Sequence, residues 1–257
     1  MARWLGELTG PEAAEVGPRS VVLQPIAAVE HHGPHLPLVT DTLIADALCD
    51  ALVARADDDD VLVLPTLSYG LSTEHVWAPG TVTLTPGNLL GVLDDVARSV
   101  VRLGGSRLAF LNTHGGNTDL LRVAAREIRA RHGLLCFVVM PMLPPDKGGP
   151  PSDEREQGLG IHGSASETSL VRYLRPDLVA MEHARRAVPS FLLDYRYVGL
   201  AGGAEVAWLS NDLGPEGVIG DPTLATEAAG KERFEAALES VVEILAEIAG
   251  FTFPPPD

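Results

Sequence analysis

The sequence predicts an α/β protein, a three-layer α/β/α sandwich around a mostly parallel sheet. Short, continuous apolar runs alternate along the chain with longer segments of helical periodicity. Continuous apolar strands are typical of a parallel sheet, because helices cover both of its faces. The 257 residues, 46% hydrophobic and 21% charged, have the composition of an ordinary globular protein. We expect a single domain over residues 1–257.

Four apolar runs are the expected strands, at residues 21–29, 61–65, 107–112 and 134–139. Apolar residues spaced three or four apart predict the helices between them. These helices cover about residues 42–55, about residues 88–103 and a segment that Asn117 can cap. A short helix contains Leu170 and Leu174, and a long one spans about residues 223–248. The apolar stripe of that last helix predicts a core or oligomer contact.

Two kinds of segment lie outside this pattern. The loop at residues 140–160 is rich in proline, glycine and charge, and loops of this length often act as lids. The aspartates at residues 57–60 and the prolines at residues 254–256 predict solvated surface.

Charge and composition exclude several classes of partner. With 19 basic and 35 acidic residues the formal net charge is −16, which disfavours nucleic acid and anionic membranes. No apolar run reaches the roughly 18 residues of a membrane helix, and the first residues lack the order of a signal peptide. The two cysteines, Cys49 and Cys136, lie in apolar stretches and predict buried thiols. A cytoplasmic location is the resulting expectation.

The first candidate site follows the first strand. Glu30 and His32 are two positions apart, so an extended backbone would point both side chains the same way. Asp41 opens the next helix and can turn back towards them, although it could instead simply cap that helix. Ligands of open parallel sheets bind outside the carboxyl ends of the strands. Carboxylate and imidazole together suit Zn²⁺, Mn²⁺ or Fe²⁺.

Two later segments carry matching chemistry. His114 ends the third strand, and two glycines follow it that let backbone approach a ligand closely. Glu167 falls in the first turn of a short helix, where the helix dipole alone would also favour a carboxylate. His162, five residues earlier, fits a metal ligand, a general acid or base, or a packed loop residue. His114 could likewise be a loop histidine bonded to backbone.

These blocks resemble the creatininase family. The resemblance is carried by residues 30–37 (EHHGPHLP), 112–117 (NTHGGN) and 162–169 (HGSASETS), supported by residues 69–81 and 212–222. It spans roughly residues 20 to 230, in the family's order. It implies an α/β/α fold, a two-metal site, hydrolysis of C–N bonds in amides, lactams or formamides, and assembly as a homo-oligomer, commonly a hexamer.

The resemblance also implies roles for single residues. Glu30, His32, Asp41 and His114 match the family's metal ligands, with Asp41 matching the bridging carboxylate, and His162 matches the catalytic histidine. Creatininase itself has a glutamate where this chain has Gly116, and Glu167 is the expected substitute ligand. His35 and His75 are left without a role.

The resulting hypothesis is a metal-dependent amidohydrolase acting on a small-molecule amide rather than on a classical peptide bond. A water molecule activated by two divalent cations would attack the carbonyl, and His162 would protonate the leaving nitrogen. Zn²⁺ is favoured, and Mn²⁺ or Fe²⁺ would also fit.

Three alternatives stay open. One is a peptidase of the type that matures the mycofactocin precursor, within the same family. Another is a metal-binding protein without catalytic activity. A nucleotide-phosphate enzyme using Gly115 and Gly116 is disfavoured, because no phosphate-loop pattern accompanies them.

Overall fold

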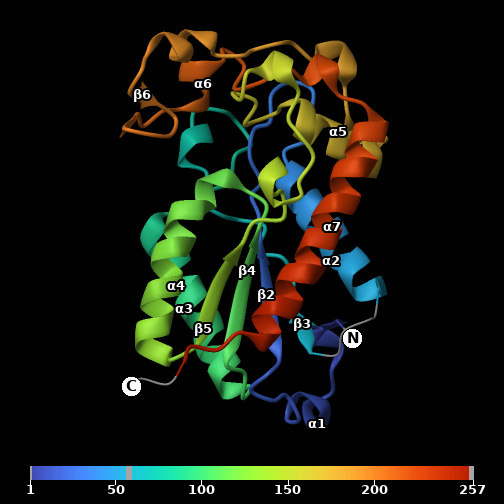
Figure 1. The fold of residues 1–257 in the computed structure, drawn as a ribbon, viewed down its shortest axis with the longest axis vertical. Coiled ribbons are helices and arrows are strands. Elements are labelled where there is room, and N and C mark those ends of the chain that lie inside the picture. The colour runs from blue at the N-terminus through green and yellow to red at the C-terminus, as the bar shows by residue number, and fades with distance from the viewer. Residues whose placement is uncertain (1, 56–59, 255–257) are drawn as a thin grey trace.

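The computed structural model describes residues 2–55 and 60–254 (Figure 1). The predicted acidic surface run at residues 57–59 and the prolines at 255 and 256 lie outside the described residues. Within these described ranges, five parallel strands form the sheet in the order β1-β3-β2-β4-β5. They are β1 (Arg3–Trp4), β2 (Val21–Ile26), β3 (Val61–Val63), β4 (Arg107–Asn112) and β5 (Leu135–Val139). The predicted α/β class and parallel sheet are confirmed, and β1 is a strand that the sequence pattern did not reveal.

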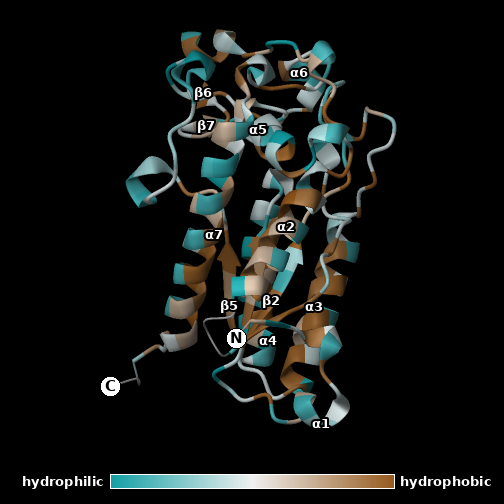
Figure 2. Cartoon of the chain, turned by 90° about the vertical axis from the view of Figure 1, so that its right-hand side faces the viewer, coloured by the Kyte–Doolittle hydropathy of each residue, from teal (hydrophilic) through white to brown (hydrophobic). Residues whose placement is uncertain are grey.

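Two pairs of helices cover the sheet (Figure 1). Helices α3 (Pro86–Arg102) and α4 (Thr118–His132) lie on one face, and α2 (Thr40–Arg55) and α7 (Glu227–Gly250) on the other. Alternate residues of β2 face the two layers: Val21 and Leu23 pack with α2 and α7, and Val22 and Ile26 with α3 and α4. Figure 2 shows the apolar residues gathered on the strands and the inner helix faces. This two-sided burial explains why the strands are apolar throughout.

The order of the strands in the sheet indicates where a ligand-binding crevice is expected. The chain passes from β2 through α2 to β3, and then through α3 to β4 on the opposite side of β2. The direction of winding therefore reverses between β2 and β4, which pair along their length from Val21↔Arg107 to Ile26↔Asn112. Ligands of such sheets bind at the carboxyl ends of the strands where this reversal occurs. Glu30 follows β2 and His114 follows β4, so both side chains belong to this crevice.

A capping region over the carboxyl ends of the strands holds most of the remaining short elements (Figure 1). It contains α5 (Ala165–Leu174), α6 (Ser210–Leu213), β6 (Val198–Gly199) and β7 (Ala204–Glu205), whereas α1 (Gly10–Ala13) lies at the opposite end of the molecule. Isolated bridges join His162 to Ile219 and Ala187 to Gly220. Within the predicted lid loop, the carboxylate of Glu156 is buried and accepts the backbone N–H groups of Ala165 and Asp221.

Some predicted boundaries differ from the structure. β2 ends at Ile26 rather than residue 29, because the chain turns and Val29 pairs antiparallel with Val82. The last helix starts at Glu227, where the Thr226 hydroxyl accepts the backbone N–H of Ala229. Asn117 occupies the predicted cap position, but its side chain makes no cap hydrogen bond.

Two further predictions concern thiols and membranes. Cys49 is buried, Cys136 is half-buried, and both are free thiols, as expected. Burial raises the pKa of each thiol to about 12, so both stay protonated at neutral pH. No helix among the described residues has the length and apolarity to cross a membrane.

Candidate metal centre

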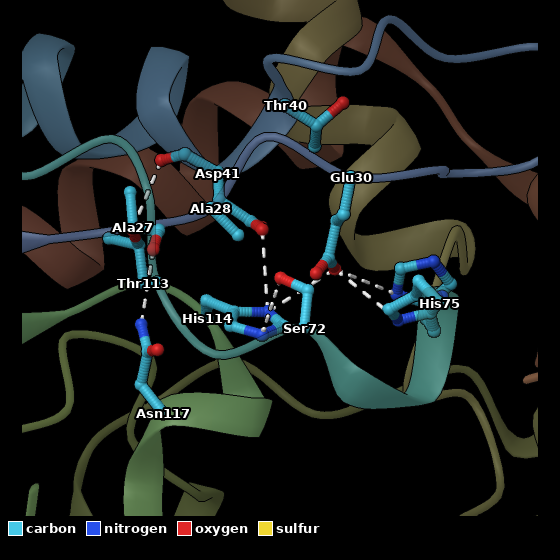
Figure 3. A network of polar contacts seen from close by, with 12 residues as sticks. Ala27, Ala28, Glu30, Thr40, Asp41, Ser72, His75, Thr113, His114 and Asn117 are labelled. Atoms are coloured by element: carbon cyan, nitrogen blue, oxygen red, sulfur yellow. Dashed lines mark hydrogen bonds and ion pairs between the residues drawn. The ribbon is translucent and has the colours of Figure 1, made fainter. Parts of the chain in front are cut away.

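Three of the predicted ligands meet between the ends of β2 and β4. Glu30, Asp41 and His114 are all buried, and Asp41 lies in the first turn of α2. Nδ1 of His114 lies 3.2 Å from Oε1 of Glu30 and 3.5 Å from Oδ2 of Asp41. Figure 3 shows Glu30 directed into the space between the rings of His114 and His75. The spacing of these atoms suits one divalent cation bound by two carboxylates and one imidazole.

The other two predicted ligands lie on the opposite side of Asp41. Nε2 of His32 is 3.4 Å from Oδ1 of Asp41, and Glu167 joins this pair with ligand atoms that all lie within 4.8 Å of one another. Glu167 also accepts the backbone N–H of Gly163 at 2.5 Å, which orients its carboxylate. The two oxygens of Asp41 therefore face different groups, one towards His114 and one towards His32. This is the arrangement that a carboxylate shared by two cations requires.

The two histidines of this set are held by their second ring nitrogens. Nδ1 of His32 lies 3.2 Å from the carbonyl oxygen of Glu30, and Nε2 of His114 lies 2.9 Å from the carbonyl oxygen of Leu71. A carbonyl only accepts, so each imidazole donates its N–H to it and turns its other nitrogen towards the carboxylates. Metal-binding histidines are commonly oriented in this way.

Unpaired buried atoms test whether the site fits a metal. Most buried polar groups in native proteins have hydrogen-bond partners. Across the described ranges, the buried side-chain atoms without one include both carboxylate oxygens of Glu30, Nε2 of His32 and Oδ2 of Asp41. These atoms belong to the ligand groups around Asp41. The donor set therefore fits divalent cations, which would satisfy all of these atoms.

His162 lies beside this set from the capping region. Its Nε2 is 2.7 Å from the carbonyl oxygen of His31, and its Nδ1 is 3.7 Å from Oε1 of Glu30. The ring centroid lies 4.3 Å from that of His32 and 4.0 Å from that of His75. Burial and the neighbouring imidazoles hold the pKa of His162 well below its ordinary value, so the ring is neutral. With its N–H donated to His31, the nitrogen that faces Glu30 is free to accept a proton.

The structure also locates three residues to which the sequence assigned no role. Nε2 of His75 lies 3.4 Å from Oε1 of Glu30, and Glu74 joins Glu30 and His75 in a further group of closely spaced ligand atoms. The adjacent Glu-His pair in residues 69–75 was the sequence signal for these two side chains. His35, in contrast, hydrogen-bonds Thr168 of α5 at 2.9 Å and connects the loop after β2 to the capping region.

The carboxylates and imidazoles of the site shift one another's pKa values through their charges. Burial opposes ionisation of Glu30, but the surrounding histidines, His114 foremost, hold its pKa well below the ordinary value. Burial likewise opposes protonation of His32 and His114, yet the adjacent carboxylates raise the pKa of each to about 10. Burial raises the pKa of Glu167 to about 7. The positive charge of the imidazoles thus offsets that of the carboxylates, although the buried oxygens of Glu30 still lack hydrogen-bond partners among the described residues.

Comparisons with known proteins agree with this geometry. The family model "Creatininase: Creatinine amidohydrolase" matches residues 6–245. The chain is 32% identical to the mycofactocin precursor peptide peptidase of Mycobacterium tuberculosis over 94% of this chain and 90% of that protein. It is 28% identical to the creatinine amidohydrolase of Pseudomonas putida over 98% of both chains.

Solved structures extend the comparison to the fold. The crystal structure of creatinine amidohydrolase (creatininase) matches with a TM-score of 0.75 and 26% identity, over 97% of this chain and 98% of that one. Two other matching structures are described as a Zn–Zn type of a creatininase mutant and as Mn creatininase. The chain belongs to the creatininase family of hydrolases.

Proposed function

We propose that this hydrolase cleaves an amide C–N bond of a peptide substrate with two divalent cations held on either side of Asp41. The observation that carries the proposal is the buried, unpaired donor set around that one carboxylate. A protein without metal chemistry would leave several buried polar atoms unsatisfied there, at a cost of about 1–3 kcal/mol each. This cost also argues against a structural role for the cluster.

The residues divide into two ligand groups. Glu30, Asp41 and His114 would hold one cation, and His32, Asp41 and Glu167 the other. Zn²⁺ or Mn²⁺ suits carboxylate and imidazole ligands. Bound cations would supply Lewis acidity and a nucleophilic water at neutral pH.

His162 is the proposed proton carrier. Its Nδ1 faces the site and is unprotonated in the neutral ring, while the carbonyl of His31 holds the other nitrogen. The ring would take a proton from the water that attacks the carbonyl carbon and deliver it to the nitrogen as the C–N bond breaks, so that the nitrogen departs as an amine. Amide nitrogen leaves poorly unless protonated, so this transfer is part of bond cleavage.

A peptide substrate is favoured by the 32% identity to mycofactocin precursor peptide peptidases over most of both chains. The absence of a carboxylate at Gly116, where creatininase has a glutamate, weighs against creatinine. The second candidate is a small amide or lactam, supported by the match to a creatinine amidohydrolase along 98% of both chains.

One assay separates the two candidates. Metal-free protein is reloaded with Zn²⁺ or Mn²⁺ and offered short peptides, creatinine, lactams and N-formyl compounds, with amine release as the readout. The proposal predicts metal-dependent release of amino acids or short fragments from peptides. Turnover of creatinine or a lactam, with intact peptides, would favour the second candidate instead.

A further inference from the structure

Gly116 leaves space that a carboxylate from another segment fills. A Cβ atom at this position would overlap Oε1 of Glu74, Nε2 of His114 and the carbonyl oxygen of Leu71. The backbone of Gly116 is not in the left-handed region, so its conformation does not require glycine. The requirement is for space, and the Glu74 carboxylate is among the groups that use it.

Glu74 reaches this space from a short 3₁₀ turn, Thr73–His75. Its Oε1 lies 3.5 Å from Nε2 of His114, and its side chain is only 16% exposed. The turn is fixed at its start, because the Ser72 N–H donates to the Thr83 hydroxyl at 2.8 Å. Together with Glu30 and His75, Glu74 offers ligand atoms that all lie within 4.8 Å of one another.

His75 is oriented in the same manner as the two histidines of the metal centre. Its Nδ1 lies 3.0 Å from the hydroxyl of Ser210, which also accepts the indole N–H of Trp77 at 2.8 Å. The other nitrogen, Nε2, lies 3.4 Å from Oε1 of Glu30 (Figure 3). Ser210 and His75 are both buried. One ring nitrogen is therefore anchored and the other is presented to a carboxylate.

The carboxylate of Glu30 gives independent evidence that a ligand binds beside His75. Its side chain is fully buried, and neither of its carboxylate oxygens has a hydrogen-bond partner within the part of the chain that the structure describes. Glu30 lies between His114 and His75, so residues on both sides of it could hold a cation (Figure 3).

We propose that Glu74 and His75 complete the cation site on the Glu30 side, with Glu74 as its additional carboxylate in the space that Gly116 leaves open. This inference rests on the proposed two-cation function and extends its ligand set. Glu167 instead groups with His32 and Asp41. With Glu30, Asp41, Glu167 and Glu74, four carboxylates balance two divalent cations.

Cobalt binding tests the inference without an activity assay. Metal-free wild type, Glu74→Gln and His75→Gln are titrated with Co²⁺ and followed by calorimetry and visible absorption, which reports ligand number and geometry. Glu7→Gln, which removes an exposed charge far from the site, controls for the general loss of negative charge. Glu167→Gln serves to identify the binding event at the other cation site, formed by His32, Asp41 and Glu167.

We expect Glu74→Gln and His75→Gln to weaken only one of the two Co²⁺-binding events. In Glu74→Gln and His75→Gln one Co²⁺ binds as in wild type, and the other binds at least about tenfold more weakly with an altered absorption band. The event that weakens differs from the one lost in Glu167→Gln. Wild-type affinities and spectra in both variants would overturn the inference and leave the proposed function standing. A wild-type chain that binds fewer than two Co²⁺ would contradict the proposed function itself.

Discussion

The two sides of the metal centre share Asp41 but are built from different parts of the fold. On one side, Glu30 and His114 follow β2 and β4, two strands whose register is fixed by parallel pairing. On the other side, Glu167 comes from α5 in the capping region, and its orientation depends on the N–H of Gly163. Glu30 and His114 of the first side both follow strands of the sheet, whereas the second side combines His32, from the loop after β2, with a carboxylate from the capping region.

The largest effect is expected from the residue that both sides share. Asp41→Asn keeps the shape of the side chain but removes the charge that faces both histidines. Metal content should fall from about two ions per chain to well below one, and hydrolysis should fall to background. Asp50→Asn, an exposed change on the same helix, should leave both unchanged. Retention of one full equivalent of metal in Asp41→Asn would mean that Asp41 serves only one side.

A substitution in only one of the two ligand groups tests whether the two cations bind independently. Glu167→Gln should remove one cation and leave the other, because Glu30 and His114 follow β2 and β4 and group with each other rather than with Glu167. Metal analysis of the purified variant should give about one ion per chain, with most activity lost. Loss of both ions would show instead that the two sides bind cooperatively.

The sequence predicted those site residues that directly follow strands of the sheet. Glu30 and His114 stand just beyond apolar strands, and the parallel order of those strands brings their carboxyl ends together. Glu74 and His75 were not assigned, because they lie in a turn with no periodic pattern. Its position depends on hydrogen bonds from Ser72 to Thr83 and from His75 and Trp77 to Ser210, which is far away in the sequence.

Asn117 shows the same limit in the fold. Its place before a helix predicted a capping side chain, but the amide instead donates to the Ala27 carbonyl and accepts the N–H of Leu71. It joins the loop after β2 to the turn that carries Glu74 and His75. Local sequence predicted the helix start correctly, while the use of the side chain was decided by segments that meet only in the folded chain.

Substitution of His162 should lower turnover without loss of bound metal. His162→Gln should lower kcat by about a hundredfold or more, as expected for loss of a proton carrier, while both cations stay bound. Metal analysis alongside steady-state kinetics checks both points. Metal loss equal to that of Asp41→Asn would instead make His162 a ligand, in line with its position near Glu30 and His32.

A pH change of one unit has the smallest expected effect. In the metal-free protein, burial opposes the charged form of His32 and His114, but the facing carboxylates raise the pKa of both to about 10, so each carries a proton at neutral pH. A cation must displace these protons, and its affinity should therefore rise with pH up to about that value. The expected slope is about tenfold per pH unit for each proton displaced. Competition titrations with Zn²⁺ between pH 6 and pH 8 measure it, and an affinity that stays constant would show that the imidazoles are already neutral.

The most direct measurement is a crystal structure of the zinc-loaded protein with anomalous data collected at the zinc edge. Two peaks should flank Asp41, one between Glu30 and His114 and the other between His32 and Glu167. A single peak, or peaks away from both oxygens of Asp41, would contradict the shared carboxylate on which the proposed chemistry depends.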